Sequence, residues 1–128
     1  ALHLVKPMGF EITDAKLKRA GLDYWAKLKP LVWENLQEFL EANLKHKERF
    51  FFATTKGQKA YFEVKFELGD FLFFGSESFG LPDELMKMKK EHLITIPMKS
   101  CGRSLNLATS VGIISFEALR QNFSHFNP

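Results

Sequence analysis

The chain has 128 residues, 45% of them hydrophobic and 26% charged, which suits one compact domain over residues 1–128 with a single core. No apolar run approaches the roughly 20 residues that a membrane-spanning helix requires, and the net charge of +3 permits contact with nucleic acid without demanding it. The single cysteine, Cys101, excludes an internal disulfide, and no cysteine–histidine pattern predicts a metal site, so a reducing cytoplasm is the simplest setting.

The first third of the chain is predicted to alternate strands with helices. Apolar runs there end at proline or glycine, and the segments between them carry capping residues or helical spacing. Leu36, Phe39 and Leu40, for example, share one face of a helix. In chain order, we expect a strand at residues 2–5, a short helix from 13 or 14 to 20, a strand at 30–33, a helix at 34–44 and a solvated, charged connection at 45–49.

The middle of the chain carries three strongly apolar strands. They run through residues 50–53, 70–74 and 93–97, and a short helix with a basic end is expected at 83–89. The strands are apolar throughout rather than alternating, which is typical of a parallel sheet that is covered on both faces. Because strands and helices alternate along the chain, the predicted fold class is α/β.

The final helix, expected from a cap at Ser104 to about residue 122, is apolar on most sides. A helix without one polar face needs two partners. One partner is its own sheet, and we expect the other to be a second subunit. The apolar positions of this helix are Leu105, Leu107, Ala108, Val111, Ile113, Ile114, Phe116, Ala118 and Leu119.

Each of the three apolar strands ends in a loop of small and polar residues, at 53–57, 75–82 and 97–106. Ligands of open α/β sheets bind beyond the carboxyl ends of the strands, so these loops are expected to form one site. Such loops hydrogen-bond the edge of an adenine through the main chain while apolar residues hold its ring. The glycine fingerprints of dinucleotide-binding and P-loop proteins are absent from the sequence, which argues against both classes.

The loop residues resemble a known family. Residues 75–82, GSESFGLP, resemble the second motif of the SPOUT methyltransferases, and residues 96–98 with 103–108 resemble the third. The segments 7–10 and 19–24 narrow the resemblance to the TrmL type, the tRNA (cytidine/uridine-2'-O-)-methyltransferases that act at the wobble position of the anticodon. The resemblance covers nearly the whole chain.

This resemblance implies a parallel sheet whose C-terminal part is threaded into a trefoil knot, and an obligate homodimer. It implies S-adenosylmethionine as the methyl donor, bound in a bent shape by the three loops, with tRNA as the substrate and no metal. By position, the residues implied to bind the donor are Ala53, Thr54, Gly75, Glu77, Gly80, Ile96, Met98, Ser104 and Leu105.

The resemblance assigns the shaping of the active site to Glu77, Ser104 and Asn106. A ribose 2'-hydroxyl is a poor nucleophile until its deprotonation is assisted, and the reacting atoms must be aligned. The family assigns this assistance to an arginine in an N-terminal motif. The chain begins at what resembles the second strand, so we expect that about two dozen residues of strand and crossover helix are missing. The chain as given is therefore expected to methylate poorly or not at all.

Several alternatives stay open at the level of sequence. One alternative is that the enzyme methylates another tRNA position or ribosomal RNA. Another is that the chain is a non-catalytic RNA-binding dimer. Ser104 and Asn106 also suit the first turn of the last helix. A cluster of basic residues either binds tRNA phosphates or is simply a solvated face of the protein. Its members are Lys16, Lys18, Arg19, Lys27 and Lys29.

Overall fold

The computed structural model describes residues 1–7, 29–76, 79–99 and 105–125, which belong to two compact units, 1–45 and 46–128. The short helix expected at 13–20 lies outside the described residues. So does the basic cluster, apart from Lys29. None of the helices in the described ranges has the length and hydropathy of a membrane span.

The first unit pairs two short strands in parallel and follows them with a helix. Strand β1 (His3–Val5) lies beside β2 (Leu31–Trp33), and helix α3 (Leu36–Asn43) comes next, so the strands expected at 2–5 and 30–33 and the helix expected at 34–44 are confirmed. The indole N–H of Trp33 donates to Nδ1 of His3 at 3.0 Å. Burial and the N-terminal amine lower the pKa of His3, which favours the neutral imidazole that accepts this hydrogen bond.

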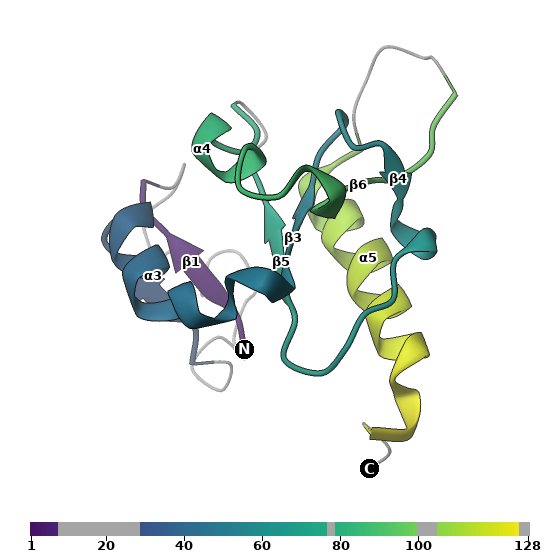
Figure 1. Ribbon diagram of the computed structural model, residues 1–128, viewed down its shortest axis with the longest axis horizontal. Coiled ribbons are helices and arrows are strands. Elements are labelled where there is room, and N and C mark those ends of the chain that lie inside the picture. Colours follow the sequence, from purple (N-terminus) through teal and green to yellow (C-terminus); the bar gives the residue numbers. More distant parts are fainter. Residues whose placement is uncertain (8–28, 77–78, 100–104, 126–128) are drawn as a thin grey trace, which may run out of the picture. The chain divides into compact units, whose positions relative to one another are not determined.

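The second unit is built on a four-stranded parallel sheet in the order β4-β6-β3-β5 (Figure 1). The strands are β3 (Phe50–Ala53), β4 (Lys59–Ala60), β5 (Phe71–Phe74) and β6 (Leu93–Thr95). The parallel α/β class is therefore confirmed, as are the three apolar strands. The sequence analysis did not predict strand β4, because a strand of two residues that includes a lysine has no apolar run.

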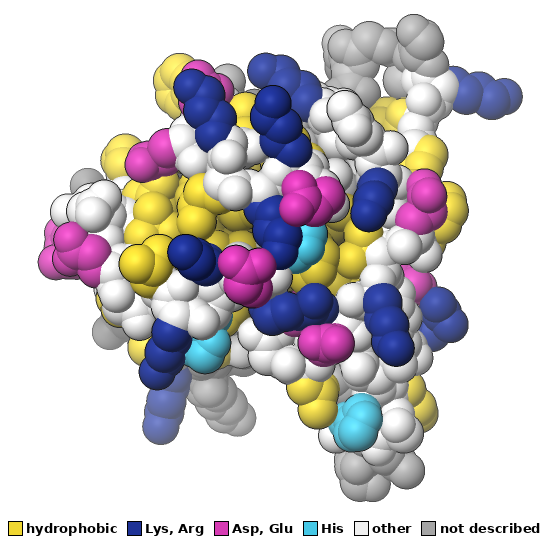
Figure 2. Space-filling model, viewed as in Figure 1, with side chains coloured by type: hydrophobic (Ala, Val, Ile, Leu, Met, Phe, Trp, Pro, Cys, Tyr) yellow, Lys and Arg dark blue, Asp and Glu magenta, His cyan; other side chains and the backbone are white. Residues whose placement is uncertain are grey.

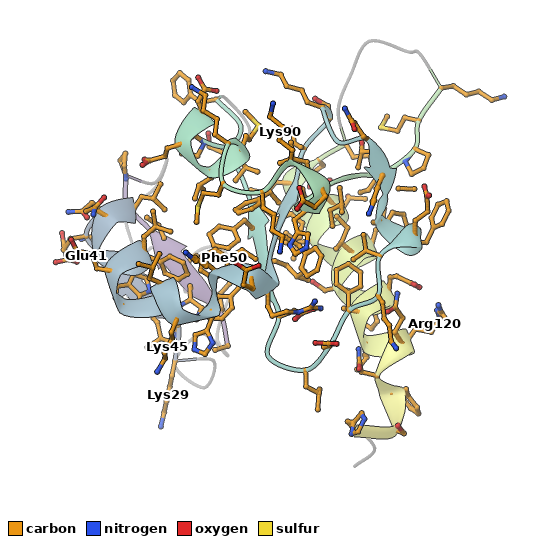
Figure 3. The ribbon with its side chains drawn as sticks, viewed as in Figure 1. Lys29, Glu41, Lys45, Phe50, Lys90 and Arg120 are labelled. Carbon is orange, nitrogen blue, oxygen red and sulfur yellow. The ribbon has the colours of Figure 1, made fainter. Side chains whose placement is uncertain are left out.

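The burial of strand β3 on both faces explains why its sequence is apolar throughout. Phe50, Phe51 and Phe52 are only 0–2% exposed, so the strand is covered on both faces. On one face, the rings of Phe50 and Phe52 lie 4.8 and 4.9 Å from the ring of Phe73 on β5, and Phe50 is labelled in Figure 3. On the other face, Phe51 packs in a cluster with Phe66, Ile94 and Ile114.

Helix α5 (Leu107–Gln121) lies along this second face of the sheet and buries Ile114 there. Its C-terminal end is fastened to the segment before β5 by side-chain amides. The Gln121 amide accepts from the N–H of Phe66 at 2.8 Å and donates to the carbonyl of Val64 at 2.9 Å. The expected helix is thus confirmed, and Phe116 on it is exposed.

Two local expectations differ from the structure. The helix expected at 83–89 is only one turn, α4 (Asp83–Met86), and the 3-10 helix η3 (Lys90–His92) follows it before β6. The connection at 45–49 is exposed at residues 45–48, as expected, but it forms the 3-10 helix η1 (Leu44–Arg49) and ends in an ion pair at Arg49. Arg49 binds both carboxylate oxygens of the nearly buried Asp70 at 2.7 Å.

Candidate functional site

The carboxyl ends of β3, β5 and β6 surround a pocket of about 240 Å³. Parallel pairing sets these ends at the same edge of the sheet, as the loops at 53–57, 75–82 and 97–106 led us to expect. The lining residues are Ala53, Thr54, Thr55, Phe74, Gly75, Ser76, Gly80, Leu81, Ile94, Thr95, Ile96, Met98, Leu105, Leu107, Ser110 and Ile114.

The loop after β3 is held tightly against β6. The N–H of Thr54 donates to the carbonyl of Ile94 at 2.9 Å, and the N–H of Gly57 donates back to the carbonyl of Thr54 at 3.2 Å. A Cβ at position 57 would lie 2.7 Å from the carbonyl carbon of Ile94, so only glycine fits this approach. Hydrogen bonds therefore fix the main chain of this loop where Thr54 lines the pocket.

In the loop after β5, two later residues are hydrogen-bonded back to Ser76. The carbonyl of Ser76 accepts from the N–H of Gly80 at 2.9 Å, and the Ser76 hydroxyl accepts from the N–H of Phe79 at 3.0 Å. Gly80 has φ +69°, a left-handed conformation that favours glycine. A Cβ on Gly75 would lie 2.1 Å from the carbonyl carbon of Gly80, so the backbone at these two residues approaches too closely to leave room for a side chain.

The third side of the pocket comes from the segment after β6 and from the start of α5. The side-chain oxygen of Asn106 accepts from the N–H groups of Ala108 and Thr109, at 2.9 and 3.3 Å, so Asn106 is the N-cap. The expectation that Ser104 caps the helix is wrong, because the cap must stand immediately before the first helical residue, which is Leu107. Ser104 itself lies outside the described residues.

The walls of the pocket combine apolar side chains with hydroxyls and main chain. Phe74, Ile94 and Ile96 supply apolar surface, and Thr54 and Ser110 are among the hydroxyl-bearing residues. The described residues that line the pocket include no charged side chain. This arrangement suits a flat heteroaromatic ring whose polar edge meets main-chain groups. Among the described residues, no cluster of three or more histidine, cysteine or acidic side chains offers a metal site.

The structure brings together every described residue that was expected to bind the donor. These are Ala53, Thr54, Gly75, Gly80, Ile96, Met98 and Leu105, and all of them line the pocket. Glu77 and Ser104 lie outside the described residues. Asn106 does not line the pocket but caps the helix that does. The binding and catalytic roles of all these residues stay predictions.

Sequence reasoning missed the contribution of α5 to the pocket. Leu107, Ser110 and Ile114 line it from three positions of the helix. Their spacing of three and four residues puts them on one face of a helix, so the signal was present in the sequence. It was hidden because the helix is apolar on most sides, and no stripe stood out.

Comparison with known proteins adds independent observations. The model of the SpoU rRNA Methylase family matches residues 1–116. A tRNA (cytidine(34)-2'-O)-methyltransferase from Aeromonas hydrophila is 45% identical over 121 residues, which cover 94% of this chain and 76% of that protein. A solved structure that describes the 2-OH methylation of C/U34 on tRNA is 41% identical, with a TM-score of 0.84, and the match covers 96% of this chain and 79% of that one.

A more distant structure shares the fold. It is the SpoU methyltransferase AviRb from Streptomyces viridochromogenes in complex with the cofactor AdoMet. Its TM-score is 0.78 at 19% identity, over 96% of this chain and 50% of that one.

Proposed function

The chain belongs to the SpoU rRNA methylase family, and on that premise we propose that it is an S-adenosylmethionine-dependent tRNA 2'-O-methyltransferase. Its substrate is the ribose of nucleotide 34, the wobble position of the anticodon. The observation that carries this proposal is the uncharged pocket at the carboxyl edge of the sheet, in a chain whose relatives are named for this reaction.

We propose that the pocket holds the adenosyl group of the donor. The fit rests on three features: apolar walls for the ring, main chain held rigid at Thr54 and Gly75, and hydroxyl groups within the lining. When bound, S-adenosylmethionine supplies an electrophilic methyl group on a sulfonium. Phe74, Ile94 and Ile96 supply the apolar surface against which the adenine ring is proposed to pack.

The residues proposed to shape the active site act in different ways. Asn106 is a positioning residue, because its side-chain oxygen holds the first turn of α5, from which Leu107 and Ser110 line the pocket. Glu77 follows the pocket-lining Ser76 directly in sequence, and its carboxylate is proposed to stand at the reacting end of the site. Ser104 is proposed to contact the donor from the segment before α5.

We propose further that the C-terminal part of the chain is threaded into a trefoil knot and that the enzyme is a cytoplasmic homodimer. Helix α5 supports the dimer, since Phe116 stays exposed on a helix that buries Ile114 against its own sheet. Light scattering of the purified chain measures its mass, and a monomer at micromolar concentration would contradict this part of the proposal.

A methylation assay with RNA transcripts tests the function. The chain is incubated with tritiated S-adenosylmethionine and tRNA that carries C34 or U34, and the labelled nucleotide is mapped by its resistance to alkaline cleavage. Label at nucleotide 34 supports the proposal, even at the low level expected of this chain. Label found only in ribosomal RNA would favour the second candidate, 2'-O-methylation of ribosomal RNA, which the family's name suggests.

Donor binding is tested separately by calorimetry with a matched pair of variants on α5. Ser110→Leu adds bulk to a pocket-lining position and is expected to weaken S-adenosylmethionine binding by about tenfold or more. Thr109→Leu makes a similar change at the neighbouring exposed position, which does not line the pocket, and is expected to bind like the unaltered chain. Equal weakening by both variants would show that the pocket is not the donor site.

A further inference from the structure

Phe79 is the most exposed large hydrophobic residue in the described part of the chain. Its exposed fraction is 92%, whereas the other exposed large hydrophobic residues range from 38% to 70%. A phenylalanine ring that is almost wholly in water forgoes the burial that normally stabilises such a residue. The ring also stands within a run of small and polar residues, which gives it no apolar neighbour in sequence except Leu81.

Hydrogen bonds tie Phe79 and Gly80 to Ser76. The backbone N–H of Phe79 donates to the hydroxyl of Ser76, and the next residue, Gly80, donates to the carbonyl of Ser76. Ser76 and Gly80 form an antiparallel bridge, and Gly75 approaches Gly80 too closely for a side chain. The backbone of Phe79 is thereby held beside the pocket, because Ser76, Gly80 and Leu81 all line it.

The other two loops at this edge place lysines next to lining residues. Lys56 follows Thr55, and Lys99 follows Met98; both lysines are exposed. On the face shown in Figure 2, charge alone does not mark an RNA surface, since lysine and arginine side chains are interspersed with acidic ones there. An exposed aromatic ring flanking a pocket whose other loops carry lysines is the more specific combination. Single-stranded RNA is bound by stacking of bases on aromatic rings and by cations at its phosphates.

We propose that Phe79 is a stacking platform for an unpaired base of the RNA loop that carries the methylated ribose. The inference rests on the proposed function and deepens it, because it names the contact that holds the substrate loop over the donor pocket. Phe79 is a positioning residue and takes no part in the chemistry. Its ring orders the loop, so its loss raises the KM for RNA more than it lowers kcat, and the affinity for the donor stays unchanged.

The test uses the full chain with an RNA stem-loop of anticodon sequence and three variants at one position. Phe79→Ala is expected to weaken RNA binding by about tenfold, which is typical for the loss of one stacked base. Phe79→Leu keeps an apolar side chain without a π face and is expected to be equally weak. Phe79→Trp is expected to restore the affinity. The slope of log affinity against log salt stays unchanged in all three, because no phosphate contact is removed.

A matched control removes an exposed phenylalanine elsewhere. Phe123 lies in the 3-10 helix η4 (Phe123–His125) beyond the end of α5, about 20 Å along the helix from the pocket-lining Ser110 by helical rise. Phe123→Ala is expected to bind RNA like the unaltered chain. Donor calorimetry and light scattering on every variant report whether the pocket and the oligomeric state survive the change.

Several outcomes would overturn the inference. Unaltered affinity in Phe79→Ala, or full affinity in Phe79→Leu, would remove the stacking role while the methylation assay of the unaltered chain still upheld the proposed function. A change of oligomeric state in Phe79→Ala would show that the ring serves contact between copies of the chain. A chain that binds the donor but no RNA would overturn both this inference and the proposed function.

Discussion

The two ends of the strands in the four-stranded sheet differ in their side chains. We call the end where the strands begin the charged edge and the end where they finish the pocket edge. Where the strands begin, ion pairs join neighbouring strands: Arg49 before β3 pairs with Asp70 before β5, and Glu48 pairs at 2.6 Å with Lys89, which precedes η3 and β6. Where the strands end, the described residues that line the pocket are uncharged. Because the strands of a parallel sheet all run the same way, the starts of β3, β5 and β6 lie at the end that carries these ion pairs, and their carboxyl ends lie at the pocket.

The distance between the charged edge and the pocket edge is long enough to screen charges at one edge from the other. Strand β3 has four residues and spans roughly 13 Å, which exceeds the Debye length of about 8 Å at physiological ionic strength. Changes at the charged edge should therefore alter the free energy of unfolding without altering donor binding. Changes at the pocket edge should alter donor binding, and they reach stability only where they disturb backbone packing.

The largest expected effect comes from Gly75→Ala at the pocket edge. The added Cβ would meet backbone atoms of Gly80 and Leu81 at 2.1–2.3 Å, and backbone cannot move aside as a side chain can. We expect a loss of about 3 kcal/mol in the free energy of unfolding and no measurable donor binding, by urea titration and calorimetry.

A second glycine serves as its control. Gly112→Ala on α5 meets nothing within 4 Å and should stabilise the helix by up to about 1 kcal/mol. Equal behaviour of the two variants would contradict the packing argument.

The next effect tests the charged edge. Asp70→Asn keeps the shape of the side chain but removes a nearly buried carboxylate that binds Arg49 twice and accepts from the N–H of Glu67 at 2.8 Å. We expect a loss of about 2–3 kcal/mol in urea unfolding and unchanged donor affinity. The matched change Glu67→Gln removes an exposed partner of the same arginine at 3.4 Å and should cost no more than about 1 kcal/mol. Loss of donor binding in Asp70→Asn would show that the two edges are coupled.

A smaller effect is expected at Asn106, where capping and activity are separable. Asn106→Ala removes the N-cap of α5 and should cost about 1 kcal/mol. Asn106→Ser keeps a capping oxygen, so its stability should stay close to that of the unaltered chain. If the Asn106 side chain acts only by positioning α5, methyl transfer should follow stability across the two variants. A stable but inactive Asn106→Ser would assign the amide a direct role in the reaction.

The smallest effect is the pH dependence of the charged edge. The hydrogen bond from Lys89 lowers the pKa of Glu48 below its ordinary value of 4.5, so the carboxylate form is favoured in the folded state. This contribution is present above pH 4.5 and is lost as the pH falls through the lowered pKa. Thermal unfolding at pH 7 and pH 3 should show a slightly smaller acid loss in Lys89→Gln than in the unaltered chain. An identical loss would mean that the pair contributes nothing.

Local patterns in the sequence were enough for most elements of the second unit. The unbroken apolar run at 50–53 predicts a strand buried on both faces, and β3 is such a strand. The small and polar loops after three such strands predict one site, because parallel strands end at a common edge. The strands and the common site are local properties or follow from chain direction, which is why sequence patterns reached them. The resemblance to a known family, and not these patterns, named the seven expected residues that line the pocket, from Ala53 in the first loop to Leu105 before α5.

Other features depend on contacts between segments that are distant in the chain. Arg49 and Asp70 are 21 residues apart, and each alone looks like an ordinary surface charge. The two-residue strand β4 exists only because it pairs with β6.

The loop glycines also show this difference between what the sequence reveals and what only the fold reveals. The sequence shows that Gly75 and Gly80 are glycines in a motif, but only the folded chain shows that a Cβ at one would strike the backbone of the other. Composition and spacing determined the α/β class and the edge that carries the pocket. Tertiary packing decided the shape of the pocket, because close approach of backbones leaves no periodic trace in a sequence.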